Sequence, residues 1–531
     1  MFNRSTAISG ALLASVLSVG LAGCSDSSSD GPDESDDLGE NGTENAAVRV
    51  VHAVADAPDV NVRLSLDSGD ATETLERLGF TGTKARAGLP AGTYEVTVDA
   101  FLPDGSEQEV LADVLTQQVE LSAGATTTLV AAGSAADRVS GDADALKLVE
   151  VTPSDDAIRE DCGNAEPPCR ARYTLVHAAA NAGPVEITAT TPDDTSITDD
   201  QFFEFDFESD NQASGDLFAG LQQKPRRIRI APDETPDERD GTDANVVFDT
   251  GSQLPSVPAG ENILAIVIDN VGTGDVDRTG ITNPARLLLI YPDGEGGSND
   301  RVFRDKDAQP AIRAAHLSQD AGGVNILANG QNINLNGVPF RTVSPYLPVS
   351  GLLRNSDGSL TVQVNDSDGT ALAMADIPLT DGDFHTGYAV GLAANTNPGI
   401  EVIGNSDAIR PVATEAQVRL VHAATQPGAV DVYATPQGGS RTKVVDGFEF
   451  KSVSPYRSLP VDLESGTQYD FEVLAAGADP EADTPAISVT RTLNGGDVVT
   501  AIARDDAMDI NDQAGQFVDD DVEANALNSE N

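Results

Sequence analysis

The chain has 531 residues, 86 of them acidic and 32 basic, which gives a formal net charge of −54 at pH 7. A charge of this size repels nucleic acid and other polyanions, so nucleic-acid binding is excluded. Only six of the bases are lysine. An aspartate-rich, lysine-poor balance is typical of exported proteins of marine or halophilic bacteria, although a calcium-dependent surface protein would use the same carboxylates.

The first 23 residues are predicted to be a secretory signal peptide. A basic start, MFNR, is followed by an uncharged, apolar stretch that ends in small residues, and the stretch is too short to span a membrane. The sequence LAGC that follows resembles the lipobox of bacterial lipoproteins. The resemblance implies that cleavage follows Gly23 and that Cys24 becomes the lipidated N-terminus, whereas an ordinary signal with an accidental cysteine is the alternative. Ser25 resembles the residue found in lipoproteins sent to the outer membrane of a Gram-negative cell.

Two acidic segments flank the rest of the chain. Residues 24–46 hold the lipidated cysteine and a linker with eight acidic and no basic side chains, which we expect to stay disordered because it offers almost no apolar surface to bury. Residues 507–531 have no Lys or Arg and are predicted to be a solvated acidic tail.

The remaining cysteines, Cys162 and Cys169, lie close together in CGNAEPPC. In an oxidising compartment such a pair is predicted to form a small disulfide loop. A redox or metal pair would need Cys-x-x-Cys or a nearby histidine, and neither is present.

One sequence unit occurs four times. Each copy begins with an apolar run ending in His, continues through a loop rich in Ala, Gly and Pro, and then has a second run of the form Val-x-Val or Val-x-Ile. The copies are VRVVHAVADAPDVNVRLSL (48–66), YTLVHAAANAGPVEITA (173–189), IRAAHLSQDAGGVNILA (312–328) and VRLVHAATQPGAVDVYA (418–434). Spacings of about a hundred residues indicate whole domains rather than solenoid repeats. The predicted repeats are 47–152, 170–292 (with an insertion), 310–404 and 416–506.

The repeats are predicted to consist of short strands. Val60, Val62 and Leu64 alternate with polar residues, as do Tyr94 and Val96 later in the same repeat, and this is the period of half-buried strands. Helical periodicity is nearly absent after the signal. The fold class is therefore all-β, with four tandem antiparallel β-sandwiches of immunoglobulin-like or transthyretin-like type.

These residues also resemble a known family. The run Val-Arg-Val-Val-His-Ala, its continuation at residues 56–62 and the later Ala-Gly-Thr-Tyr-Glu-Val are similar to the bacterial domain of unknown function 4397. The resemblance implies a secreted, β-rich domain that occurs in tandem on surface proteins and lipoproteins. It implies no activity, and the second copy departs most from the pattern.

The repeated histidines are interpreted as structural. They are His52, His177, His316 and His422. Each points to the same face as the apolar residues two and four positions before it, so we expect a neutral ring at the mouth of the sandwich that bonds a loop carbonyl. Arg49, Arg313 and Arg419 fall on the opposite face, which is expected to be wet. A metal site would need partners that each repeat lacks, and no catalytic nucleophile accompanies these histidines.

Other motifs are weak. No serine-hydrolase elbow, phosphate loop, zinc-protease motif or dinucleotide fingerprint is present, so no cofactor and no enzyme activity are expected. The acidic segments 269–280, 365–370 and 509–521 could hold calcium, but none fits the twelve-residue calcium loop, and solvated turns explain them as well. The tracts TVSPY (342–346) and SVSPY (452–456) are either ligand-facing loops or proline turns with a packed tyrosine.

Two classes of function remain. The first is a lipid-anchored surface protein whose sandwiches serve adhesion, matrix contact or ligand binding, with a glycan or a protein as the extracellular partner and the membrane held through the lipid. The second is a periplasm-facing scaffold or binding module of an envelope complex. A hydrolase is a third hypothesis, and no motif in the sequence favours it.

Overall fold

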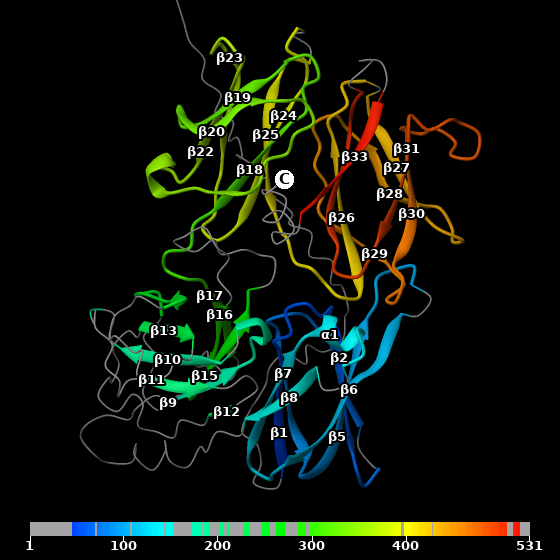
Figure 1. The fold of residues 1–531 in the computed structure, drawn as a ribbon. Coiled ribbons are helices and arrows are strands. Elements are labelled where there is room, and N and C mark those ends of the chain that lie inside the picture. The colour runs from blue at the N-terminus through cyan, green and yellow to red at the C-terminus, as the bar shows by residue number, and fades with distance from the viewer. Residues whose placement is uncertain are drawn as a thin grey trace, which may run out of the picture. The chain divides into compact units, whose positions relative to one another are not determined.

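The computed structural model describes residues 45–69, 72–106, 109–142, 145–151, 172–182, 184–190, 193, 202–205, 210–211, 227–232, 246–254, 262–270, 285–292, 298–394, 398–426, 428–506 and 513–520. These residues form four successive repeats of two sheets each (Figure 1). The prediction of tandem β-sandwiches is therefore confirmed. No helix in these ranges is both long and apolar enough to cross a membrane.

Repeat 1 pairs a sheet of order β4-β1-β7-β8 with a sheet of order β3-β2-β5-β6. Its strands are β1 (Asn45–His52), β2 (Val60–Leu66), β3 (Thr72–Leu78), β4 (Thr83–Pro90), β5 (Gly92–Phe101), β6 (Val110–Leu121), β7 (Thr126–Gly133) and β8 (Leu146–Val151). The short helix α1 (Ala135–Val139) follows β7, and the Ser134 side chain caps it by accepting from the Asp137 N–H.

Repeat 2 has sheets of order β12-β9-β15-β16-β17 and β11-β10-β13-β14. Its strands are β9 (Arg172–His177), β10 (Val185–Thr190), β11 (Phe202–Phe205), β12 (Asp210–Asn211), β13 (Arg227–Pro232), β14 (Phe248–Asp249), β15 (Asn262–Asp269), β16 (Ala285–Pro292) and β17 (Ser298–Phe303), with the 3-10 turn η1 (Ala180–Ala182) after β9.

Repeats 3 and 4 share the topology of repeat 1. Repeat 3 has orders β21-β18-β24-β25 and β20-β19-β22-β23, and repeat 4 has β29-β26-β32-β33 and β28-β27-β30-β31. The strands of repeat 3 are β18 (Ala311–His316), β19 (Val324–Ala328), β20 (Gln331–Val338), β21 (Leu347–Pro348), β22 (Leu360–Asn365), β23 (Ala371–Ile377), β24 (Phe384–Val390) and β25 (Glu401–Asp407), with the 3-10 turn η4 (Gly351–Leu353). Those of repeat 4 are β26 (Glu415–His422), β27 (Val430–Pro436), β28 (Thr442–Phe448), β29 (Arg457–Pro460), β30 (Thr467–Ala475), β31 (Ile487–Leu493), β32 (Val498–Asp505) and β33 (Gln513–Asp519).

One strand pair in each repeat is parallel. The histidine strand pairs in parallel with a late strand of the same repeat: β1 with β7, β9 with β15, β18 with β24 and β26 with β32. All other strand pairings within the described ranges are antiparallel. A parallel pair needs a long crossover, and here the chain crosses to the opposite sheet and returns before the pair forms.

The middle residue of the Val-x-Val run has a defined role in the second strand of a repeat. Its side-chain oxygen accepts a backbone N–H from a residue at positive φ in the next strand, where the pairing register shifts. The three cases are Asn61 with Arg77 (2.9 Å, φ 49), Asn325 with Gly337 (2.9 Å, φ 60) and Asp431 with Gly447 (2.8 Å, φ 58). The motif thus holds a β-bulge in each of these repeats.

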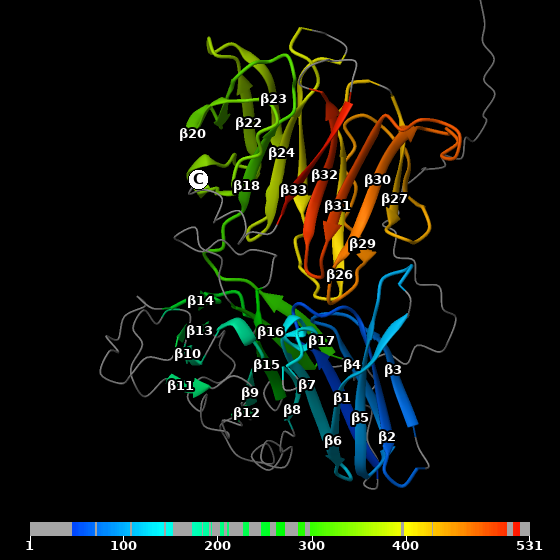
Figure 2. The ribbon, with the colours of Figure 1, turned by 45° about the vertical axis from the view of Figure 1, so that its right-hand side comes forward.

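The histidine strand is buried on both faces. Val48 and Val50 of β1 point into the core of repeat 1, whereas Val51 and Ala53 pack with Val176 of repeat 2 in a second apolar cluster. A corresponding cluster joins repeats 3 and 4, through Ala315, Leu317, Tyr388, Val390, Val421, Ala423 and Ile502. The sheet of β18 and β24 therefore faces the sheet of β26 and β32 (Figure 2). The repeats pack in pairs, 1 with 2 and 3 with 4.

The structure corrects three predicted ends of repeats. Strand β17 lies beyond residue 292, β25 runs past residue 404 to Asp407, and β33 (Gln513–Asp519) lies in the segment predicted to be a solvated tail. β33 pairs along β32 and closes its sheet. Each of these last strands has only two large apolar residues, and the two are adjacent, so the alternation of apolar side chains that marks a strand is missing.

Because the repeats pack in pairs, we expect Ile502→Ala to destabilise the protein. Ile502 lies on the outward face of its sheet and is 1% exposed. Because a neighbouring repeat covers this face, we expect the substitution to lower the free energy of unfolding by about 2–5 kcal/mol. Met374→Ala, at a side chain that is 66% exposed, is the matched control and should change little. Chemical denaturation of both variants measures the difference, and equal effects would show that Ile502 faces water.

Candidate functional site

The four repeated histidines are buried, at 0–1% exposure. In three of them the ring Nε2 lies within hydrogen-bond distance of a carbonyl oxygen six residues later: His52 with Pro58 (3.0 Å), His316 with Gly322 (2.9 Å) and His422 with Gly428 (2.8 Å). A carbonyl only accepts, so Nε2 carries the proton. In His52, His177 and His316, Nδ1 accepts from the backbone N–H two residues on. Each such ring therefore connects the end of its strand to the loop that follows.

A phenylalanine turn lies beside three of these rings. The ring centroids of His52 and Phe80 are 6.3 Å apart and edge-on, and the same geometry occurs for His316 with Phe340 and for His422 with Phe450. The residue after each phenylalanine has positive φ and donates its backbone N–H to the histidine carbonyl at 2.8 Å: Thr81, Arg341 and Lys451. The histidine thus fixes two loops at one end of the sandwich.

Burial keeps these rings neutral. It lowers the pKa of His52 to about 4, and it lowers the pKa of His316 and of His422. A neutral ring whose Nε2 is bonded to a backbone carbonyl is suited to fixing loops.

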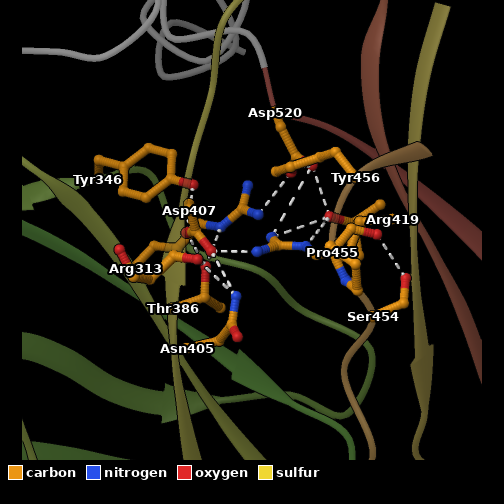
Figure 3. Close-up of polar contacts among 12 residues, drawn as sticks. Arg313, Tyr346, Thr386, Asn405, Asp407, Arg419, Ser454, Pro455, Tyr456 and Asp520 are labelled. Carbon is orange, nitrogen blue, oxygen red and sulfur yellow. Dashed lines mark hydrogen bonds and ion pairs between the residues drawn. The ribbon is translucent and has the colours of Figure 1, made fainter. Parts of the chain in front are cut away.

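The most elaborate polar arrangement lies between repeats 3 and 4. We call Arg313, Asp407, Arg419 and Asp520 the ion quartet (Figure 3). Each is at most 3% exposed. Arg313 Nη2 is 2.5 Å from Asp520 Oδ1, and Arg419 Nη1 is paired with Asp407 Oδ1. The arginine of each repeat is thus neutralised by the aspartate that ends the other repeat.

Hydroxyl groups complete the quartet with the same pattern on both sides. The Tyr346 hydroxyl donates to Asp407 and the Tyr456 hydroxyl donates to Asp520, both at 2.7 Å. Nε of each arginine donates to a threonine on the parallel partner strand: Arg313 to Thr386 (2.9 Å) and Arg419 to Thr500 (3.1 Å). Each guanidinium also lies over a tyrosine ring, 4.7 Å from its centroid: Arg313 over Tyr346 and Arg419 over Tyr456.

The electrostatics of the quartet follow from burial and pairing. Burial by itself would raise the pKa of Asp407, but Arg419 and Arg313 outweigh it and hold that pKa below its usual range. Burial, followed by the neighbouring carboxylates, raises the pKa of Tyr346 and of Tyr456, so both tyrosines stay protonated as donors. Two positive and two negative groups are therefore enclosed with no net charge.

The quartet corrects the expected place of the arginines. Arg313 and Arg419 were expected on a wet face, yet they are buried because that face meets another repeat. Arg49, the residue in the same position of repeat 1, is half-buried. The two tyrosines belong to the TVSPY and SVSPY tracts, so the packed-tyrosine interpretation describes them, while Tyr456 also lines a cleft.

This cleft of about 520 Å³ lies against the Arg419 side of the quartet. Its wall comes from the end of repeat 3 and its continuation, through Asn405, Ser406, Ala408 and Arg410, and from β26 and the SVSPY tract of repeat 4. Gln417, Ser454 and Ser458 contribute polar groups, and Arg419 and Tyr456 contribute the side facing the quartet. Cavities of this size accommodate small ligands.

Several predicted sites lie outside the described residues: Gly23, Cys24, Cys162 and Cys169. Within the described ranges no three His, Cys, Asp or Glu side chains form a group that could hold a metal ion. The acidic segment 509–521, considered above for calcium, contributes Asp520, whose carboxylate is committed to Arg313, Tyr456 and Thr500. The turn at 365–370 is closed by Asp366, which accepts backbone N–H groups from Asp368 and Thr370.

Sequence reasoning missed both aspartates of the quartet. A signal for the quartet was present, because repeats 3 and 4 combine an arginine three residues before the histidine, the Ser-Pro-Tyr tract and a threonine on the late strand. Repeat 2 has Thr174 at the arginine position, and repeat 1 lacks the tract. Nothing local distinguishes Asp407 and Asp520 from the many other acidic residues of this chain.

Two regions of the chain match a known sequence family. A sequence profile described as "Domain of unknown function (DUF4397)" matches residues 46–188 and 310–433. The first match begins in β1 and the second begins one residue before β18, and they end in the second strand of the next repeat, β10 and β27 respectively. No curated protein matches the chain.

The chain is remotely similar to several solved structures. A DUF3823 family protein from Bacteroides uniformis is 13% identical, over 37% of this chain and 94% of that one, with a TM-score of 0.12. The Bacillus anthracis TIE protein is 8% identical over 87% and 68%, with a TM-score of 0.12. BcpA, the major pilin subunit of Bacillus cereus, is 10% identical over 86% and 98%, with a TM-score of 0.11. TM-scores this low carry no argument about function.

We expect two arginine substitutions to lower the free energy of unfolding by unequal amounts. Arg313→Met removes the nearer cation of the buried Asp520 and leaves only Arg419, at 3.9 Å, so we expect the free energy of unfolding to fall by about 3–5 kcal/mol. Arg63→Met is the matched control, because Arg63 is 42% exposed in its pair with Asp99, and a pair of this kind contributes at most about 1 kcal/mol. Adding Asp520→Asn to Arg313→Met should recover part of the loss. Equal losses for the two single variants, measured by denaturation, would contradict the quartet's role.

The histidines predict loss of stability in acid. Between pH 6.5 and about 4 the unfolded chain binds a proton at His52 that the folded chain does not, so this contribution is complete above pH 6.5 and lost as the pH falls. The loss reaches about 3 kcal/mol near pH 4. The stability advantage of the natural chain over His52→Gln should shrink accordingly. An NMR titration, with the His52 signal assigned from the variant, should give a pKa near 4; a value near 6.5 would overturn the argument.

Proposed function

The chain belongs to the family of the domain of unknown function 4397, and on this premise we propose that it is a non-catalytic, lipid-anchored protein of the cell envelope whose paired β-sandwiches serve adhesion, matrix contact or ligand binding. The repeats act in pairs rather than singly. Their loops and clefts are the binding surfaces, and the signal and linker are the means of attachment.

One observation carries this proposal: repeats 3 and 4 are joined through a buried interface. The apolar cluster and the ion quartet both bury groups that a freely jointed chain would leave in water. Buried arginine–aspartate pairs are directional, because each hydrogen bond needs a fixed geometry. A pair of sandwiches joined in this way holds its loops in fixed positions, which is what a binding surface needs.

Attachment rests on the N-terminal sequence. Cleavage before Cys24 and acylation of that residue would place several acyl chains in a membrane, and more than one chain is needed for stable anchoring. The acidic linker after Cys24 would extend the sandwiches away from the lipid surface, since its like charges repel one another. Ser25, which resembles the residue of exported lipoproteins, favours the outer membrane.

The second candidate is a scaffolding or binding module that faces the periplasm. The same anchor favours it, because a lipid in the inner leaflet of an outer membrane would leave the repeats on the periplasmic side. The paired repeats would then hold an envelope complex together.

Protease treatment of intact cells separates the two candidates. If the chain is on the surface, peptides from all four repeats are released from whole cells and identified by mass spectrometry. Lysed cells are the control for cleavability, and Cys24→Ala is the control for anchoring, since this variant should appear in the soluble fraction. Protection of all repeats until lysis would rule out the adhesin and support the periplasmic scaffold.

A further inference from the structure

The cleft beside Arg419 has a composition unlike that of the chain as a whole. Asp and Glu account for 86 of the 531 residues, yet none of the residues lining this cleft is acidic. The lining instead offers amides and hydroxyls, from Asn405, Ser406, Gln417 and Ser458 among others. It therefore presents many uncharged donors and acceptors in one concave place.

The fold does not require these polar groups. Gln417 pairs across the sheet with Ser458, and the corresponding pair in repeat 3 is Ala311 with Pro348. Repeat 3 builds the same sheet edge and the same half of the quartet with these apolar residues. The amide and hydroxyl are thus a feature of repeat 4 alone within this pair of repeats.

The charges near the cleft are already matched. Arg419 is neutralised by Asp407 and also bonds Thr500, and Arg410 donates to the carbonyl oxygens of Ala55 and Ala57. Glu415 lies next to the cleft and accepts from Gln417 and Ser458. The charge of Arg410 is offset by the nearby carboxylates of Glu415, Asp59 and Asp56. Both arginines therefore have little free charge to attract an anion, and the net charge of −54 opposes its approach.

We propose that this cleft binds a segment of an uncharged oligosaccharide. Sugar hydroxyls both donate and accept, so they match the amide oxygens of Asn405 and Gln417 and the hydroxyls of Ser406 and Ser458. Tyr456 gives the cleft an aromatic wall, and its ring is held by Arg419 and its hydroxyl by Asp520. The quartet holds this wall in place before the ligand arrives, which lowers the cost of ordering on binding.

This inference deepens the proposed binding function and rests on it. Protease treatment of cells reports where the repeats are, whether or not the cleft binds sugar. If the repeats are exposed on cells but the cleft binds no sugar, the proposed surface function stands and the oligosaccharide site is wrong. If the repeats are protected from protease but the cleft binds sugar in solution, the oligosaccharide site stands and the surface function is wrong.

The test measures binding of defined sugars by calorimetry. The protein is the full-length mature chain carrying Cys24→Ser, and the probes are the uncharged hexasaccharides of cellulose, starch, mannan and xylan, with hexagalacturonate as the anionic comparison. The blocking variant is Ala408→Trp, which places a large ring at the exposed rim and leaves every polar group intact. Ala476→Trp, at an exposed loop position on the other sheet of repeat 4, is its matched control.

We expect at least one uncharged hexasaccharide to bind, Ala408→Trp to weaken that binding at least about tenfold, and Ala476→Trp to leave it unchanged. A second variant, Gln417→Ala, should weaken binding without changing the melting temperature by more than the exposed-amide control Gln468→Ala does. Three results would overturn the inference: no hexasaccharide binds, binding survives Ala408→Trp, or hexagalacturonate binds more tightly than every uncharged probe.

Discussion

The burial of the histidine strand on both of its faces is the constraint on which the structure depends. One face completes a sandwich core, and the other meets the same strand of the neighbouring repeat. A strand in that position cannot carry charge on its outer face unless the charge is neutralised inside the interface. Arg313 and Arg419 lie there, and the aspartates that neutralise them come from the opposite repeats.

This exchange of partners ties the ends of the repeats together. Asp407 closes repeat 3 and Asp520 follows the last strand of repeat 4, so each sandwich supplies the counter-ion of the other. Removing one member leaves a buried charge, whereas an all-apolar interface could hold the same surfaces together without that penalty. The ionic arrangement instead sets the orientation of the two repeats. The tyrosine and threonine hydroxyls donate to each carboxylate, and these bonds form in only one placement of that carboxylate. The cleft inherits its fixed aromatic wall from this geometry.

The histidines stabilise contacts within one repeat, whereas the quartet stabilises contacts between two repeats. The histidine ring, the phenylalanine turn and the asparagine or aspartate of Val-x-Val hold loops and a bulge within one sandwich. In repeats 3 and 4, the arginine three residues before the histidine instead acts across two sandwiches. The arginine and the histidine are three residues apart on one strand, so their side chains point to opposite faces of the sheet. A single short sequence therefore directs both the fold of the repeat and its pairing.

The sequence by itself determined the fold class, the number of repeats, the family and the inward direction of His52 and its counterparts, because two-residue alternation and repetition are local properties of a chain. It could not identify the outer face of the strand as an interface, because an arginine such as Arg313 on that face is equally typical of a strand that faces water. It also missed β33, whose only large apolar residues, Phe517 and Val518, are adjacent rather than alternating, and which pairs along β32. Asp520 and Arg313 are 207 positions apart. Only the tertiary structure brings such residues within bonding distance, because pairing of distant charges depends on how whole sheets pack.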